Sequence, residues 1–169
     1  MIPDVATLPE GRRFTLTRRF RATTAELWTL WTTAKGIKSW WGPPGFAVTV
    51  QSIDLRPGGS LHYTMEARAP EMVAFMQANG MPVATPCSLT YREISPNRRL
   101  AYENLVDFVP GVAPYSTALA VEFRQDGDHA EMVLTFERMH DATWDNRQRM
   151  GWEQELGKLE AALNATHQA

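Results

Sequence analysis

The chain has 169 residues, a length that fits one domain. A content of 44% hydrophobic and 21% charged residues, with six tryptophans, excludes an intrinsically disordered, collagen-like or coiled-coil chain. The net charge of -2 provides no overall positive field for nucleic acid or an anionic membrane, so neither is an expected partner. We therefore expect one globular domain over residues 1–169, with its core at about 14–163.

The cysteine content and the N-terminus bear on the cellular compartment. Cys87 is the single cysteine and cannot form an internal disulfide, which is typical of a reducing compartment. Residues 1–13 lack the apolar run of a signal peptide, and the sequence contains no stretch of about eighteen apolar residues. We expect a cytoplasmic protein without a membrane span.

One strand and two helices are predicted at the start of the chain. Residues 13–21 alternate between polar and apolar side chains, which predicts a strand. Thr23 and Glu26 have the spacing of a capping box, and apolar residues then recur at helical intervals as far as Gly36. A short second helix follows to about residue 41, where a Gly-Pro-Pro-Gly sequence ends it.

Six further strands are predicted as three hairpins, because extended segments flank turn-forming residues at 56–59, 95–98 and 126–128. The predicted strands are 48–55 and 60–67, 87–94 and 100–105, and 117–124 and 130–138. Asp141 then has the position of an N-cap for a long terminal helix. The apolar stripe of that helix consists of Trp144, Trp152, Leu156, Leu159 and Leu163. The expected class is α+β.

The order of the strands predicts which segments meet. An antiparallel meander must bury one face, and only the terminal helix is long enough to cover it, so the sheet must curl around that helix. Every second connection of a meander lies at the same end, so the long connections 68–86 and 106–116 share one end with the start of the terminal helix. The expected rim residues are Trp40, Trp41, Phe46, Met72, Phe75, Met76, Phe108, Tyr115 and Trp144. We expect the three tryptophans among them to form one aromatic cluster.

The connection 68–86 has a second feature. Met72, Phe75 and Met76 are spaced as neighbours on one face of a short helix within residues 70–81. Methionine adapts to varied apolar partners. The segment is therefore either a lid over the mouth of a pocket, or a loop packed on the domain or against a second copy of the chain.

Polar residues on inward faces are the other candidates. Arg18 and Asn104 each share a face with apolar neighbours, so each could bind an internal residue or the polar end of a ligand. For Arg18 we favour a carboxylate partner at the margin of the sheet. Tyr63, Tyr91 and Tyr102 are equally consistent with a pocket or with plain core.

Catalytic and metal-binding patterns are weak in this sequence. His62 is expected on the solvated face of its strand, and no histidine or cysteine has metal-ligand spacing. Cys87 lacks a nucleophile motif and is expected to be a small buried residue. We therefore assign no catalytic residue, no metal and no cofactor.

Four segments together resemble a known superfamily in their order and spacing. They are residues 31–41, 54–59 and 93–100, and Gly151-Trp152 with the three leucines that follow. The chain resembles the START-like (SRPBCC) helix-grip superfamily, and within it the AHSA1 family, related to the C-terminal domain of the activator of Hsp90 ATPase. The resemblance implies a curved antiparallel sheet of about seven strands, as in Bet v 1-like proteins, gripping a long C-terminal helix. It also implies an apolar cavity between them that holds small hydrophobic molecules.

The function expected from the resemblance is binding of a small hydrophobic molecule with an aromatic character, with any reaction resembling that of a polyketide cyclase or dehydratase. The alternative is a protein interaction module of the Hsp90-activator type, a co-chaperone or stress-related protein without turnover. The sequence does not decide whether the chain forms a homodimer. The expected cavity residues are Trp40, Trp41, Phe46, Tyr63, Met65, Met72, Phe75, Met76, Tyr91, Tyr102, Asn104, Phe108, Tyr115, Trp144 and Trp152.

Two glycines inside the terminal helix call for an explanation, since each costs about 1 kcal/mol relative to alanine. Gly151 lies near the inward side, so we expect it to leave space for the cavity or for the close approach of a strand. Gly157 has no comparable role.

Overall fold

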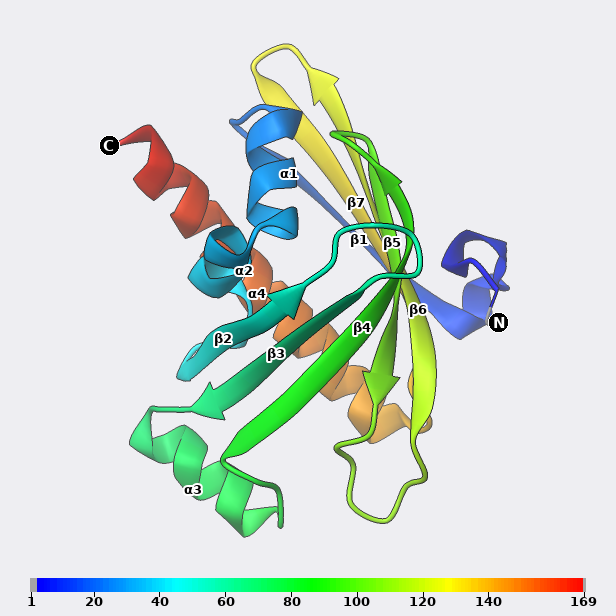
Figure 1. Cartoon of the computed structure of the whole chain (residues 1–169), viewed down its shortest axis with the longest axis vertical. Coiled ribbons are helices and arrows are strands. Elements are labelled where there is room, and N and C mark those ends of the chain that lie inside the picture. Colours follow the sequence, from blue (N-terminus) through cyan, green and yellow to red (C-terminus); the bar gives the residue numbers. More distant parts are fainter. Residues whose placement is uncertain (1–2, 169) are drawn as a thin grey trace.

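A curved sheet wraps around one long helix in the computed structural model of the protein, which describes residues 3–168 (Figure 1). The sheet is antiparallel and seven-stranded, which confirms the expected α+β helix-grip fold. Two short 3-10 helices, Val5–Thr7 and Glu10–Arg12, precede the sheet. The strands and α-helices are β1 Arg13–Phe20, α1 Thr24–Thr32, α2 Ala34–Trp40, β2 Phe46–Ile53, β3 Ser60–Ala67, α3 Pro70–Ala78, β4 Ala84–Ser95, β5 Arg99–Val106, β6 Tyr115–Asp126, β7 His129–Glu137 and α4 Ala142–His167.

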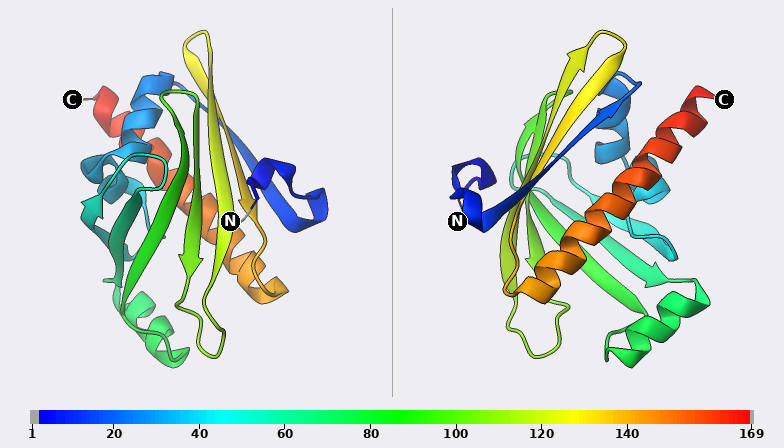
Figure 2. Two further views of the ribbon diagram at one scale, coloured as in Figure 1. Left: turned by 45° about the vertical axis from the view of Figure 1, so that its right-hand side comes forward. Right: turned by 180° about the vertical axis from the view of Figure 1, so that it is seen from behind.

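The strand order is β1-β7-β6-β5-β4-β3-β2, so the first strand pairs with the last one. The β1–β7 register sets Phe14 opposite Phe136 and Phe20 opposite Ala130. Five of the six pairs join strands that are neighbours in the sequence, whereas the β1–β7 pairing is a non-local one that periodicity alone does not predict. The right-hand view of Figure 2 shows α4 crossing one face of this sheet diagonally.

The predicted hairpins are confirmed as β2–β3, β4–β5 and β6–β7. The capping box at Thr23 and Glu26 is present, and the Asp141 side chain accepts a hydrogen bond from the Trp144 backbone as the N-cap of α4. As the order of strands predicts, α3, the β5–β6 connection and the start of α4 lie at the same end of the sheet (Figure 1). This end is where the functional site is expected.

The core is concentrated around the second half of α4. Its buried apolar residues are Leu156, Leu159 and Leu163, and no apolar side chain between Ala142 and Glu155 is fully buried. The short helices α1 and α2 complete this part of the core with the fully buried Trp31 and Trp40. The first half of α4 therefore lies next to a less tightly filled part of the molecule.

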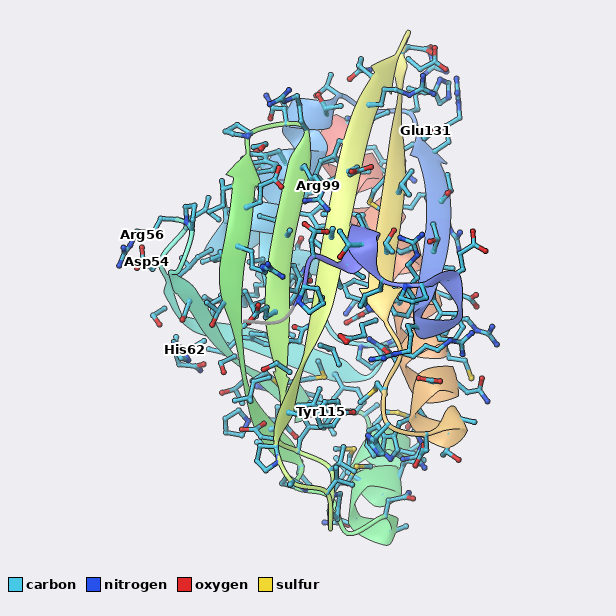
Figure 3. The ribbon with its side chains drawn as sticks, turned by 90° about the vertical axis from the view of Figure 1, so that its right-hand side faces the viewer. Asp54, Arg56, His62, Arg99, Tyr115 and Glu131 are labelled. Atoms are coloured by element: carbon cyan, nitrogen blue, oxygen red, sulfur yellow. The ribbon has the colours of Figure 1, made fainter. Side chains whose placement is uncertain are left out.

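The N-terminal segment packs on the convex face of the sheet, which sequence patterns do not predict. Val5 is 1% exposed in a small cluster with three alanines of β5 and β6, namely Ala101, Ala118 and Ala120. The Arg99 guanidinium donates to both oxygens of Asp4 at 2.9 and 3.0 Å, and it also pairs with Glu93 and Glu122. Figure 3 shows Arg99 on this outer face beside the N-terminal segment. Small residues on the sheet leave the space that the segment fills.

A Val5→Ala substitution tests this contact. Removal of two buried methyl groups should lower the free energy of unfolding by about 1.5 kcal/mol, as measured by chemical denaturation. The packing of α4 on the concave face should not change, because Val5 lies on the opposite face of the sheet. An unchanged denaturation midpoint would mean that the segment contributes nothing to the stability of the fold.

Candidate functional site

A cavity of about 720 Å³ lies between the concave face of the sheet and the first half of α4. Its wall also includes the Trp41–Phe46 loop, α3 and the end of β5. A second hollow of about 490 Å³ on the convex face surrounds Arg98 and Arg99 and is lined mostly by charged side chains, several of which are ion-paired. The cavity beneath the helix is thus the one with apolar walls.

α4 presents little bulk to the cavity at one position, Gly151. Gly151 lines the cavity, and a Cβ atom built on it would meet no atom within 4 Å. Of the two expected roles for Gly151, space for the cavity fits this geometry, whereas the close approach of a strand does not. Gly157 also has open space around it, but it is exposed and lines no part of the cavity.

The inner end of the cavity is backed by packed aromatic rings. Trp31 stacks on Trp152 with ring centroids 5.8 Å apart, and Trp40 contacts Trp41 edge-to-face at 6.0 Å. Trp41 in turn lies 5.3 Å from Tyr63. Rings packed in this way leave little freedom for rearrangement, so this wall is a firm one.

The expectation that Trp144 joins Trp40 and Trp41 in one cluster is wrong. Trp144 instead contacts Phe108 at 6.0 Å and His140 at 6.1 Å, at the beginning of α4. It precedes Trp152 by eight residues, or about 12 Å along the helix, and Trp152 takes the place beside Trp40. Trp144 does lie at the predicted end of the sheet. It is too close to the start of α4, however, to reach Trp40 and Trp41.

Twelve of the fifteen predicted residues line the cavity. These are Trp41, Phe46, Tyr63, Met65, Met72, Phe75, Met76, Tyr102, Asn104, Phe108, Trp144 and Trp152. Their role in ligand binding stays a prediction.

The other three predicted residues lie outside the cavity wall. Trp40 is buried in the core and its indole donates to the Leu30 carbonyl at 2.8 Å. Tyr91 is buried beside Tyr102, with ring centroids 6.3 Å apart. The Tyr115 hydroxyl forms a 2.6 Å hydrogen bond with His140 Nδ1 instead.

Glu155 is a cavity residue that the sequence analysis did not find. It is half-buried, and its Oε1 accepts a 2.6 Å hydrogen bond from the backbone of Gly42, which adopts a positive φ of 83°. Lys158 Nζ donates to the Gly42 and Trp41 carbonyls at 2.8 and 3.3 Å. Two charged residues of α4 thus hold the turn that follows α2. The signal was available, since Glu155 follows the inward-facing Trp152 by three residues.

The surroundings of Glu155 favour its neutral form. Burial raises the pKa of its carboxyl group to about 7, although the Gly42 N–H and the Lys158 charge oppose this shift. Burial likewise lowers the pKa of Lys158, against the effect of Glu155. At neutral pH the Glu155 carboxyl group can therefore both release and accept a proton.

The other titratable groups of the inner wall are protonated at neutral pH. Burial raises the pKa of the Tyr63 and Tyr102 hydroxyls well above the ordinary value. Burial also raises the pKa of the Cys87 thiol to about 11, so the nucleophilic thiolate is scarce. Cys87 is half-buried rather than fully buried as expected, and its thiol is neutral at neutral pH.

Two polar candidates from the sequence lie away from the cavity. Arg18 donates to the Thr17 carbonyl at 2.9 Å, and within residues 3–168 it has no carboxylate partner. His62 is exposed, as expected, and Figure 3 shows it on the outside of the sheet. The described residues contain no group of three or more metal-ligating side chains, and none of their helices is both long and apolar enough to cross a membrane.

Several solved structures share this fold. A protein from Chromobacterium violaceum is 21% identical, covers 90% of this chain and 97% of its own, and superposes with a TM-score of 0.74. A protein from Nitrosomonas europaea is 19% identical over 96% of this chain and 100% of its own, with a TM-score of 0.73. The AHSA1 protein from Silicibacter pomeroyi is 20% identical over 92% of this chain and 99% of its own, with a TM-score of 0.70.

The sequence itself matches one family. No curated protein matches the chain. The family described as "Activator of Hsp90 ATPase homolog 1-like protein" matches residues 21–164, from just after β1 through most of α4. This span contains all the residues that line the cavity. The chain therefore belongs to the Activator of Hsp90 ATPase homolog 1-like family.

Proposed function

We propose that this protein binds a small, mostly apolar molecule with an aromatic part in the cavity between the sheet and α4. The observation that carries the proposal is the cavity itself. Its volume of about 720 Å³ lies within the range of small-molecule sites, which is roughly 300–1,000 Å³. Its wall combines apolar and aromatic side chains with a few polar groups, as such sites do.

The composition of the wall supports an aromatic ligand. Trp41, Tyr63 and Trp152 place ring surfaces along the inner part of the cavity, where offset or edge-to-face contacts with a ligand ring are favourable. Towards α3 the wall changes to flexible side chains, including Met72 and Met76. Thioether side chains adapt to different ligand shapes, so the outer part of a ligand is the less restricted one.

The attachment of α3 supports a movable mouth. No residue of α3 is fully buried, and Phe75 is 43% exposed. The helix is held at its start, where the Arg68 and Ala69 N–H groups donate to the Gly45 carbonyl at 2.8 and 3.0 Å. A Cβ atom on Gly45 would come within 2.6 Å of Met72, so glycine at this position permits the close approach of α3. Among the two expected roles of this segment, we favour the lid.

A cyclase-like or dehydratase activity is the enzymatic form of this proposal. The cavity would fold a reactive chain in a dry environment, and Glu155 is the lining residue placed to exchange a proton at neutral pH. Binding without turnover requires no such step, so binding is the core of the proposal. A cytoplasmic location and a single domain over residues 1–169 remain predictions.

The second candidate function is that of a co-chaperone or stress-related interaction module. One observation favours it. Phe75 and Met150 are 43% and 57% exposed, and both lie at the cavity. A protein partner could cover them, and the family description refers to activation of the Hsp90 ATPase. Stimulation of Hsp90 ATPase activity, together with no response of the protein to small molecules, would favour this candidate.

The binding proposal is tested with 2-naphthalenemethanol, a neutral aromatic probe. We expect a rise in the melting temperature that grows with probe concentration, and a change in tryptophan fluorescence that is reduced in a Trp152→Phe variant. Native mass spectrometry of freshly purified protein should also detect a retained small molecule. A flat thermal response at saturating probe would contradict the proposal.

The two helix glycines offer a matched pair of variants. Gly151→Leu should fill part of the cavity and weaken binding of 2-naphthalenemethanol by about tenfold or more, since it replaces open space with a side chain. Gly157→Leu should leave binding unchanged, because that position is exposed. Both variants should gain up to about 1 kcal/mol of helix propensity, so a difference in binding between them isolates the cavity. Equal binding by both variants would place the ligand elsewhere.

The lid is tested by replacing residues 71–81 with a short Gly/Ser linker. Cooperative unfolding should persist, because α3 contributes no fully buried residue and loop closure entropy varies slowly with length. The association and dissociation rates of the probe should both rise in stopped-flow fluorescence. Loss of the cooperative transition would show instead that this segment belongs to the core.

A further inference from the structure

We propose that the ligand carries a cationic amine or ammonium group, which the Glu155 carboxylate binds at the inner end of the cavity among surrounding aromatic rings. This inference rests on the proposed binding function and names the chemical class of the ligand. It makes the cavity selective for amines over neutral or anionic molecules of the same shape.

One oxygen of the Glu155 carboxylate is available to a cationic ligand. Its Oε1 accepts the Gly42 N–H at 2.6 Å, but within residues 3–168 its second oxygen has no hydrogen-bond partner and the carboxylate has no ion pair within 4 Å. Lys158 does not supply one, because its ammonium group donates to the Gly42 and Trp41 carbonyls instead. Glu155 is half-buried, and its surroundings favour the neutral carboxyl group, whereas a ligand ammonium group would favour the ionised form.

The other groups that face Glu155 do not compete for this role. They are Tyr63 on β3, Cys87 on β4 and Tyr102 on β5, and burial keeps all three protonated and neutral at pH 7. Lys158 on α4 is the remaining charged neighbour, and it is engaged with the turn. The inner end of the cavity therefore offers a ligand one acidic group and no free cation among the residues described.

The mouth of the cavity carries one cation, Arg147, and one acidic residue, Glu71 of α3. Arg147 lies eight residues before Glu155, about 12 Å along α4. Its guanidinium lies over the rings of Trp144 and Phe75, at 4.9 and 5.7 Å from their centroids. Arg147 is thus placed against the outer rings, away from Glu155, and Lys158 is the cation whose charge acts on Glu155.

Aromatic faces near Glu155 add to the preference. Trp41 lies 5.3 Å from Tyr63 and 6.4 Å from Tyr102, and all three residues line the cavity. Aromatic rings attract cations through their negative faces, by roughly 0.5–2 kcal/mol, and tryptophan does so best. A carboxylate among such rings combines the two elements that recognise an ammonium group.

The pH dependence of binding follows from the Glu155 carboxyl group. Burial raises its pKa to about 7, so the group is largely ionised at about pH 8 and largely neutral at about pH 5.5. Amine affinity should therefore fall as the pH decreases through this window. The affinity of a neutral molecule should change little over the same range.

Three probes of one shape test the inference: 2-naphthylmethylamine, 2-naphthalenemethanol and 2-naphthoic acid. At about pH 8, calorimetry should show that the amine binds at least about tenfold more tightly than the alcohol, and that the acid binds most weakly. The amine preference should decrease by about tenfold at about pH 5.5. The alcohol serves as the internal measure of the cavity itself.

Glu155→Gln is the decisive variant, because glutamine keeps an oxygen for the Gly42 N–H but has no charge. It should remove the amine preference, measured as the ratio of the amine affinity to the alcohol affinity in the same variant. Glu153→Gln, at an exposed position of the same helix, should bind all three probes like the parent protein. Circular dichroism should confirm that both variants are folded.

The possible failures are distinguishable. Alcohol binding without a preference for the amine would overturn this inference and leave the proposed function intact. An amine preference that survives in Glu155→Gln would overturn the role of Glu155. Failure of all three probes to bind would overturn both this inference and the binding function on which it rests.

Discussion

The contact between the second half of α4 and the concave sheet is the interaction on which the rest of the structure depends. Leu156, Leu159 and Leu163 are all at most 2% exposed there, and burial of one such side chain contributes roughly 1.5–3 kcal/mol. The start of the helix is attached as well, because the buried Asp145 accepts a hydrogen bond from the Met139 backbone and pairs with Arg138. The cavity lies beneath the part of α4 between these two attachments.

Glu155 lies at the boundary between the two halves of α4. Its ionised form lowers the stability of the fold, but the proposed ligand binding requires that form. Its pKa in the folded state, about 7, is above its ordinary value of 4.5, so ionisation favours the unfolded chain. The stability contributed by this group is therefore highest below about pH 4.5 and falls as the pH rises towards 7. The full difference corresponds to a cost on the order of 3 kcal/mol. An apolar residue would avoid this cost, whereas a carboxylate that binds a cationic ligand recovers part of it on binding.

Local rules explain why much of the fold is predictable from the sequence. The Asp-Gly turn between β6 and β7 and the capping box at Thr23 act within a few residues, so they can be read directly. The meander then fixes which connections share an end of the sheet. It does not fix depth along α4, which is why Trp144 was placed with the wrong partners. No sequence pattern predicts the burial of Val5, because it depends on alanines about a hundred residues later in the chain.

The same distinction separates the fold of this family from the function of this chain. Structures only about 20% identical superpose on it with TM-scores of 0.70–0.74, so the fold is set by the pattern of buried positions and turns rather than by particular residues. Such a fold leaves the cavity wall free to vary, and fold alone does not determine a ligand. The groups that deviate from the apolar pattern therefore carry the functional information. In this chain the candidates are Gly151, which leaves open space beside the cavity, α3 at its mouth, and Glu155, the carboxylate for which we propose a ligand ammonium group.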